Sequence, residues 1–391
     1  MARRHAGDGM AISERATGVH DTCETRHAGH GTATRFYQPE LDALRFFAFL
    51  SVLIHHGPKT AGIFGAAISA GGFGLSMFFL LSAYLITELL IREREQSGTV
   101  VWRLFFIRRA LRIWPLYYAA LATVTLLVKI WPQIDRLGNT GIAGLVFFVA
   151  NWVPIFQLGV LLGPLWSISI EEQFYFIWPP IVKAGGARLA LAVSICFTIV
   201  CFAWLAIFHG NGWWLWFATP VQFLFFAAGA MIAIAVRSDR MGWMKRIGVV
   251  TRVTFFMTGI AILAVAARIG GVAGNIERPT VAGFYVGYGG GLIGCVLIFI
   301  AVLGAPYVPR PLIYLGRISY GLYVFHNGVL LFAERIVAPS GLSRHSLANA
   351  LLVDGLALIL CTLMASLSYR YFESPFLRLK ERFAVVKSRP V

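Results

Sequence analysis

Long apolar segments restrict this chain to one broad architecture. Eleven of them occur along the sequence, and most approach or exceed the roughly 20 residues that an α-helix needs to cross a bilayer. They lie at residues 40–57, 72–91, 111–131, 142–158, 167–184, 187–208, 214–236, 249–268, 281–303, 318–337 and 347–370. Charged residues make up only 13% of the chain, against about 25% in a typical soluble domain. The sequence therefore predicts an all-α, polytopic transmembrane helical bundle.

Basic loops between these segments indicate the topology. Lys and Arg are concentrated at residues 91–112, 236–248 and 308–317 and in the tail after Tyr369. Because cytoplasmic loops are enriched in Lys and Arg, we expect these four regions and both termini to be cytoplasmic. This arrangement predicts about ten spanning helices. It leaves one segment, 142–158, as re-entrant or interfacial, since that segment is short and contains Asn151 and Pro154.

The net charge indicates which partners the chain can bind, and the cysteine pattern indicates whether it holds a metal. The net charge is +16, but the basic residues are dispersed between apolar segments, which favours the bilayer surface over nucleic acid as a partner. The five cysteines form no CxxC or Cys/His cluster, so no metal site is predicted. We expect residues 1–36 to be a polar, disordered cytoplasmic extension, residues 37–378 to be the membrane domain, and residues 379–391 to be a basic cytoplasmic tail.

The first apolar segment carries ionisable side chains, which are costly in a membrane and usually face a cavity, a partner or a substrate path. Arg45 and His56 are eleven positions apart in "LDALRFFAFLSVLIHHG". In a helix that separation is about three turns, or roughly 16 Å, so the two side chains point to the same side at different depths. His55 points elsewhere, and we expect it to have a structural role.

A second polar group is the pair of adjacent glutamates in "PLWSISIEEQFYFIWPP", residues 164–180. Ser167 or Ser169 can cap the helix, which would make Glu171 a residue of its first turns with a role only in helix initiation. The functional alternative pairs Glu171 with His56 at the outer end of the bundle. There a carboxylate would orient the imidazole and leave its other ring nitrogen free to act as a base.

Arg109 and Arg112 lie three residues apart in the basic stretch "FIRRALRIWPLYY", residues 106–118, so they share one face of the predicted helix. The planar guanidinium group suits phosphate binding. Anchoring at the membrane interface explains the same spacing equally well, because three aromatic side chains follow closely. The sequence leaves both alternatives open.

Tyr320, Tyr323 and His326 recur at three-residue spacing after Ser319 in "LGRISYGLYVFHNG", residues 315–328. These four side chains lie within two to three turns of one predicted helix. They either line a substrate path or make hydrogen bonds between packed helices.

Taken together, these residues resemble the motifs of the acyltransferase-3 family, in the same order, over residues 38–378. The matching stretches are LDALR followed by His56, FFLLSAYL at residues 78–85, Arg109 and Arg112 before Pro115, Trp166 and Ser167 with Glu171, Phe174 and Tyr175, Ser319 and Tyr320 with Tyr323 and His326, and YRYFESPF at residues 369–376. The chain departs from the family pattern at Ala43 and Ala83, where the family has glycine, and at Ile168, where it has leucine.

The resemblance implies a membrane O-acyltransferase, mostly found in bacteria and therefore expected in the inner (plasma) membrane. It implies transfer of an acyl group, usually acetyl, from cytoplasmic acyl-CoA to a hydroxyl of a carbohydrate or lipid-linked sugar. A multi-pass transporter or flippase for a glycan or lipid precursor is the alternative, and the oligomeric state is left open.

The resemblance and the spacing of the polar residues together give a hypothesis for the site. His56 is the general base and Glu171 orients it. Arg109 and Arg112 bind the phosphates of acyl-CoA, and the pantetheine arm enters the bundle past Arg45. The residues expected along the path are Ser82, Ser319, Tyr320, Tyr323 and His326.

Overall fold

The computed structural model describes residues 36–60, 68–238, 242–270 and 280–386. Over these ranges the chain forms helices and has no β-strand, which confirms the all-α class. The expected extension at residues 1–36 lies almost entirely outside the described residues, as does the end of the tail from residue 387 onward.

Nine helices of 18 residues or more account for most of the described chain. They are α1 (Pro39–His56), α3 (Phe73–Ser97), α4 (Trp102–Ile130), α7 (Trp166–Phe208), α9 (Thr219–Val236), α10 (Val249–Ile269), α11 (Val281–Val302), α13 (Ser319–Val337) and α14 (Leu347–Leu367). The shorter helices are α5 (Asn139–Val146), α6 (Gly159–Leu162), α8 (Gly212–Leu215), α12 (Arg310–Arg317) and α15 (Ser374–Glu381). A π-helical turn, Ser368–Glu373, joins α14 to α15.

Seven helical stretches of the described chain are long and apolar enough to cross a membrane. They are Ile68–Ser97, Trp102–Ile130, Gly159–Phe208, Thr219–Val236, Val249–Ile269, Val281–Val302 and Leu347–Glu381. The expected count of about ten is therefore not confirmed. Three expected spans account for the difference. The segment 40–57 forms α1, which contains Glu40, Asp42 and Arg45, and the segment 318–337 forms α13, which contains Glu334 and Arg335. The segments 167–184 and 187–208 fall within one helical stretch that is kinked at Gly186.

Helix α7 has a sharp kink at Gly186, where the sequence predicts a break between two helices. Gly186 has a φ of 58° within it, a left-handed conformation that glycine adopts without steric cost. A Cβ atom at this position would lie 1.9 Å from Nη1 of Arg94 on α3. The kink thus depends on glycine for its backbone conformation, because the Arg94 side chain is flexible and could move aside.

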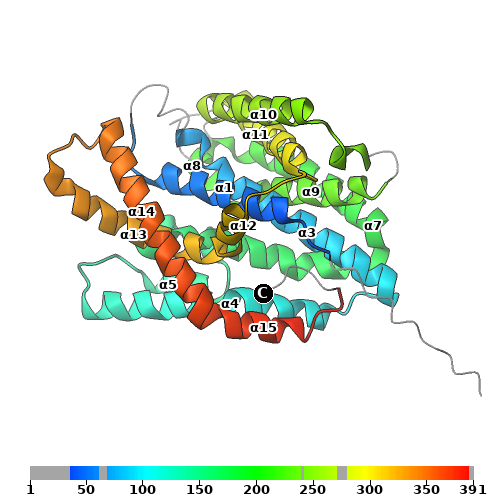
Figure 1. Ribbon diagram of the computed structural model, residues 1–391, viewed down its shortest axis with the longest axis horizontal. Coiled ribbons are helices and arrows are strands. Elements are labelled where there is room, and N and C mark those ends of the chain that lie inside the picture. Colours follow the sequence, from blue (N-terminus) through cyan, green and yellow to red (C-terminus); the bar gives the residue numbers. More distant parts are fainter. Residues whose placement is uncertain (1–35, 61–67, 239–241, 271–279, 387–391) are drawn as a thin grey trace, which may run out of the picture. The chain divides into compact units, whose positions relative to one another are not determined.

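Helix α3 is the centre of the larger apolar core and packs against α1, α7 and α9. Its contact with α9 is close because Gly229 faces the carbonyl oxygen of Leu80, which a Cβ atom at Gly229 would approach to 2.1 Å. Figure 1 shows α10 and α11 side by side at one edge of the bundle and α13 with α14 at another, pairings that the residue contacts confirm. A second apolar cluster joins α1, α13 and α14.

The segment expected at 142–158 forms the eight-residue helix α5 followed by 3-10 turns at Ala150–Trp152 and Ile155–Gln157. A helix of eight residues rises about 12 Å, much less than the roughly 30 Å of the hydrocarbon core. The segment is tied into the protein by the side-chain amide of Asn151, which donates to the carbonyl oxygen of Phe217 at 3.1 Å. Its re-entrant or interfacial placement stays a prediction.

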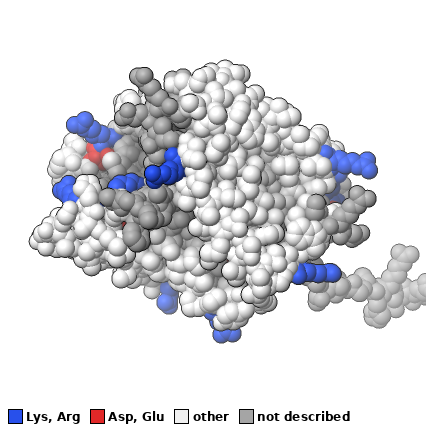
Figure 2. Space-filling view, turned by 90° about the horizontal axis from the view of Figure 1, so that it is seen from above, with Lys and Arg blue, Asp and Glu red and all other residues white. Residues whose placement is uncertain are grey.

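The surface is consistent with a lipid environment. Figure 2 shows a face on which uncharged residues cover broad areas, while most Lys and Arg side chains lie toward the two ends of the view. Many large apolar side chains are exposed on the long helices, including Phe176, Ile199 and Ile207 on α7 and Ile359 on α14. An apolar surface of this kind is stable in contact with lipid rather than water.

Candidate active site

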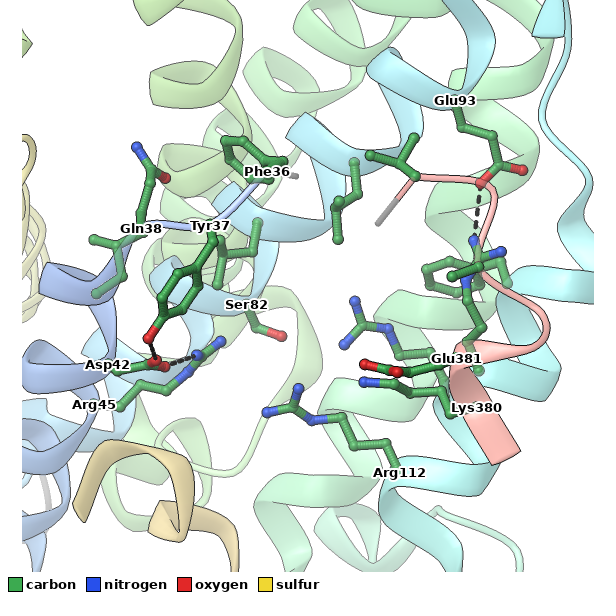
Figure 3. Close-up of a pocket in the computed structure, with 18 of the residues that line it drawn as sticks. Phe36, Tyr37, Gln38, Asp42, Arg45, Ser82, Glu93, Arg112, Lys380 and Glu381 are labelled. Atoms are coloured by element: carbon green, nitrogen blue, oxygen red, sulfur yellow. Dashed lines mark hydrogen bonds and ion pairs between the residues drawn. The ribbon is translucent and has the colours of Figure 1, made fainter. Parts of the chain in front are cut away.

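A cavity of about 470 Å³ lies between α1, α3, α4 and the C-terminal segment that contains α15. Figure 3 shows Arg45 and Arg112 pointing into it from opposite sides, with Lys380 and Glu381 entering from the end of α15. Its basic lining residues are Arg45, Arg108, Arg109, Arg112, Arg378, Lys380 and Arg382, and its acidic ones are Asp42, Glu93 and Glu381. Basic residues exceed acidic ones by four, so the cavity is suited to an anionic ligand.

One of the arginines, Arg45, is held by an acidic neighbour. Nη1 of Arg45 lies 3.0 Å from Oδ1 of Asp42, which is almost fully buried, and the Tyr37 hydroxyl donates to Oδ2 of Asp42 at 2.9 Å. Burial, together with the negative charge of Asp42, raises the pKa of Tyr37, so this phenol stays protonated and able to donate. The three residues form a rigid corner of the cavity at the start of α1.

Arg109 and Arg112 line the same cavity, and no carboxylate of the described residues forms an ion pair with either. The Arg109 guanidinium lies over two aromatic rings, 5.4 Å from the centroid of Phe105 and 5.2 Å from that of Tyr175. Aromatic faces orient a guanidinium by cation–π attraction without occupying its hydrogen-bond donors. These two arginines therefore keep donors available for a ligand.

A smaller cavity of about 90 Å³ continues from the large one into the bundle. Arg45, Ser82, Arg109 and Arg112 line both cavities and so mark their junction. The inner lining also includes Ser167, Glu171, Tyr175, Ser319, Tyr320 and Tyr323. The tertiary structure thus brings together, around two adjoining cavities, every site residue predicted from the sequence except the two histidines.

Hydrogen bonds fix the polar side chains of this inner cavity. The Tyr175 hydroxyl donates to Oε1 of Glu171 at 2.5 Å and accepts from the Ser82 hydroxyl at 2.7 Å, which joins α3 to α7. From α13, the Tyr320 hydroxyl donates to the carbonyl oxygen of Ile113 on α4 at 2.8 Å. The inner cavity is therefore a preorganised polar site between four helices.

Tyr323 connects this cavity to the histidines. Its hydroxyl lies 2.8 Å from the Ser167 hydroxyl and 3.0 Å from the carbonyl oxygen of Pro164, while its own carbonyl oxygen lies 2.6 Å from Nδ1 of His326. The His326 ring packs against the ring of Tyr323 at 5.2 Å and against that of His56 at 5.0 Å, measured between centroids. A continuous set of contacts thus runs from the inner cavity to the end of α1.

The hydrogen bonds of the two histidines define their neutral tautomers. Nδ1 of His56 lies 3.0 Å from the carbonyl oxygen of Val52, and Nδ1 of His326 faces the carbonyl of Tyr323. Because a carbonyl oxygen only accepts, Nδ1 carries the proton in each neutral ring and Nε2 keeps its lone pair. Nε2 of His326 is buried and has no hydrogen-bond partner among the residues that the structure describes, and the His56 side chain is exposed at the end of α1.

The structure does not bring Glu171 and His56 together. Glu171 lines the inner cavity with Arg45, Arg109 and Arg112, and its hydrogen-bond partner is Tyr175. An outer position for Glu171 requires α7 to begin at a membrane surface. In the structure α7 begins at Trp166, which is buried, and Glu171 lines the inner cavity together with Arg45. The neighbour of His56 is His326.

Several lining residues were not assigned a role from the sequence. Asp42 lies three residues before Arg45, an ion-pair spacing that was visible in the sequence. Tyr175 belonged to a quoted motif but was given no role. Arg378, Lys380 and Arg382 were counted only as positive charge near the tail, because no sequence signal places them beside α4. Within the described ranges, no group of three or more His, Cys, Asp or Glu side chains is arranged to hold a metal ion.

Comparison with known proteins is consistent with this geometry. The model of an acyltransferase domain matches residues 38–370, and the chain belongs to the acyltransferase-3 family. It is 27% identical over 378 residues to peptidoglycan O-acetyltransferase OatA of Listeria monocytogenes, with 88% of this chain and 56% of that protein covered. It is 26% identical over 362 residues to O-acetyltransferase OatA of Staphylococcus aureus, with 87% and 57% covered.

The chain therefore spans little more than half the length of these relatives. No solved structure matches it significantly. The family membership and the apolar helices together identify it as an integral membrane protein of the acyltransferase type.

Proposed function

We propose that this protein is a membrane O-acyltransferase that moves an acetyl or related acyl group from acyl-CoA to a hydroxyl of a carbohydrate acceptor. The observation that carries the proposal is an arginine-rich cavity that adjoins a polar inner cavity, with Arg45, Ser82, Arg109 and Arg112 lining both and Tyr323 leading from the inner cavity to the histidines. The family of the chain supports the reaction type.

The large cavity binds the donor. Arg109 and Arg112 hold its phosphates through charge-assisted hydrogen bonds, for which they have donors available. The pantetheine arm is uncharged and narrow, so it passes Arg45 and Ser82 at the junction and carries the thioester into the inner cavity. Glu171 lines the inner cavity with these arginines. Its carboxylate offsets their positive charge on the inner side, while the phosphates bind in the large cavity.

His56 is the general base of the transfer. Its Nε2 takes the proton of the acceptor hydroxyl as the hydroxyl oxygen forms a bond to the thioester carbonyl carbon. The carbon–sulfur bond then breaks and the proton passes to the departing CoA thiolate. His326 packs against His56 and positions its ring, while Ser319, Tyr320 and Tyr323 line the path between the donor and the base.

The acceptor is a glycan of the cell envelope or its lipid-linked precursor. Two relatives of this chain are named as O-acetyltransferases, one of them acting on peptidoglycan. A bacterial inner membrane with both termini in the cytoplasm places the donor cavity where acyl-CoA is made and His56 toward the opposite side. The transporter alternative is not favoured, because the family match and the relatives are all acyltransferases.

Transfer of radiolabel tests the proposal. Proteoliposomes that contain the full chain are given [¹⁴C]acetyl-CoA and a peptidoglycan or lipid-linked glycan acceptor, and label in the acceptor is counted. His56→Ala should abolish transfer, whereas His55→Ala is the matched control because the ring of His55 hydrogen-bonds to the carbonyl of Ile68 instead. Normal transfer in His56→Ala would refute the base assignment. Movement of intact glycan across the bilayer without label would support a transporter.

Donor binding is tested separately by calorimetry with acetyl-CoA. Arg109→Ala and Arg112→Ala should each weaken binding about tenfold or more, since each removes a charge-assisted hydrogen bond. Arg335→Ala on α13 is the control, because Arg335 lies outside both cavities. Unchanged affinity in the first two variants would assign those arginines to membrane anchoring.

A further inference from the structure

The C-terminal segment forms one wall of the donor cavity, although it lies beyond the acyltransferase domain match, which ends at residue 370. Helix α15 and the residues after it contribute Arg378, Lys380 and Arg382 to the lining. Figure 3 shows Lys380 and Glu381 beside Arg112, on the side of the cavity opposite Arg45. The segment predicted to be a cytoplasmic tail is, up to residue 386, a structural part of the site.

Specific contacts hold this wall in place. Helix α15 packs along α4, as Figure 1 also shows. Nη1 of Arg108 donates to the carbonyl oxygen of Phe383 at 2.9 Å, and Nη2 of the same guanidinium lies 2.8 Å from Oε2 of Glu93 on α3. Glu93 in turn accepts from the backbone N–H of Val101 at 2.9 Å through its other oxygen. Arg108 therefore fastens the end of the chain to two helices of the membrane domain.

The basic residues of the cavity fall into two groups by position. Arg109 and Arg112 also line the inner cavity, so they lie at the junction. Arg378 and Arg382 line only the large cavity and not the inner one, and both side chains are exposed. In acyl-CoA the diphosphate lies closer to the thioester than the ribose 3′-phosphate does. When the thioester enters the inner cavity, the diphosphate is therefore the nearer of the two phosphate groups. The diphosphate thus reaches the junction arginines while the nucleotide end extends toward the C-terminal wall.

We propose that Arg378 and Arg382 bind the ribose 3′-phosphate of acyl-CoA and so make the C-terminal segment a donor-specificity element. The inference rests on the proposed function, since it specifies which part of the donor each wall recognises. A phosphate monoester carries about −1.5 to −2 charge at pH 7, more than each phosphate of a diphosphate ester, and arginine binds it through two parallel hydrogen bonds. Without this contact the enzyme would accept thioesters that lack the 3′-phosphate equally well.

The test compares acetyl-CoA with acetyl-dephospho-CoA, which lacks only that phosphate. Binding of both is measured by calorimetry to the full chain in a neutral detergent without anionic lipid, for the wild type and for the double variant Arg378→Ala, Arg382→Ala. We expect the wild type to prefer acetyl-CoA by about tenfold to a hundredfold, and the variant to lose that preference while binding acetyl-dephospho-CoA as the wild type does. Arg344→Ala, in the exposed loop before α14, controls for net charge.

Each outcome has one meaning. Wild-type protein that binds neither thioester overturns the proposed function itself. If the wild type binds both but the double variant keeps its preference, the C-terminal wall does not read the 3′-phosphate. If the double variant binds both ligands more weakly by the same factor, the two arginines act only as a general source of positive charge. That result would overturn the proposal as well. The charge-conserving variant Arg378→Lys, Arg382→Lys, which keeps the wall cationic, should retain part of the preference and replaces the alanine pair if that fails to fold.

Discussion

Tyr323→Phe removes one hydroxyl that links α13 to the start of α7, and its cost can be estimated from the contacts. The hydroxyl makes two hydrogen bonds, to Ser167 at 2.8 Å and to the carbonyl oxygen of Pro164 at 3.0 Å. Hydrogen bonds between membrane helices contribute about 0.6 kcal/mol on average and up to about 1.7 kcal/mol, so two of them are worth about 1–3 kcal/mol. Each hydroxyl has one proton, so when Tyr323 donates to Pro164 it accepts from Ser167. Without the Tyr323 hydroxyl, Ser167 can donate to the carbonyl oxygen of Pro164, 3.0 Å away, so the loss falls toward the lower figure.

Tyr320→Phe, on the same helix, is the matched control. Its hydroxyl makes one hydrogen bond, to the carbonyl oxygen of Ile113, so its loss should cost about 0.6 kcal/mol. The free energy of unfolding is measured by SDS titration of the purified protein in mixed micelles, monitored by tryptophan fluorescence. We expect the Tyr323 variant to lose about twice as much stability as the Tyr320 variant. Equal losses, or no loss at Tyr323, would refute the assignment of the Tyr323 hydroxyl as the link between α13 and the start of α7.

Three further predictions concern other parts of the structure. Gly186→Ala should lower stability by about 1–2 kcal/mol because of its left-handed backbone, while Gly163→Ala, with open space around it, should be nearly neutral in the same SDS titration. Arg108→Ala removes the ion pair with Glu93 and the bond to the C-terminal segment, so trypsin should cleave that segment roughly tenfold faster; an unchanged cleavage rate would contradict the fastening role. Tyr175→Phe unlinks α3 from α7 in the inner cavity and should reduce acetyl transfer about tenfold to a hundredfold in folded protein, whereas full activity would remove Tyr175 from the site.

The sequence located much of the candidate site, because costly polar groups stand out against apolar segments. Arg45, Arg109 and Arg112 were expected at the donor end, and the structure gathers them around one cavity. The pairing of Glu171 with His56 was not found. Its prediction depended on where α7 begins relative to the membrane, and a helix that starts inside the bundle shifts every depth estimate along it.

Helix composition and helix placement have different origins. Apolar segments of about 20 residues must become helices in lipid, since every backbone polar group needs an internal partner there. The all-α class, the charged residues within α1 and the family motifs were therefore determined by the sequence alone.

Only the tertiary structure decided which polar side chains meet. Packing of α4 against α15 brings Arg378 and Arg382 to the cavity that holds Arg112, more than 260 positions earlier in the chain. Packing of α1 against α13 likewise places His326 beside His56. Contacts between residues so far apart in sequence depend on side-chain packing between helices, which no periodicity within one segment can encode.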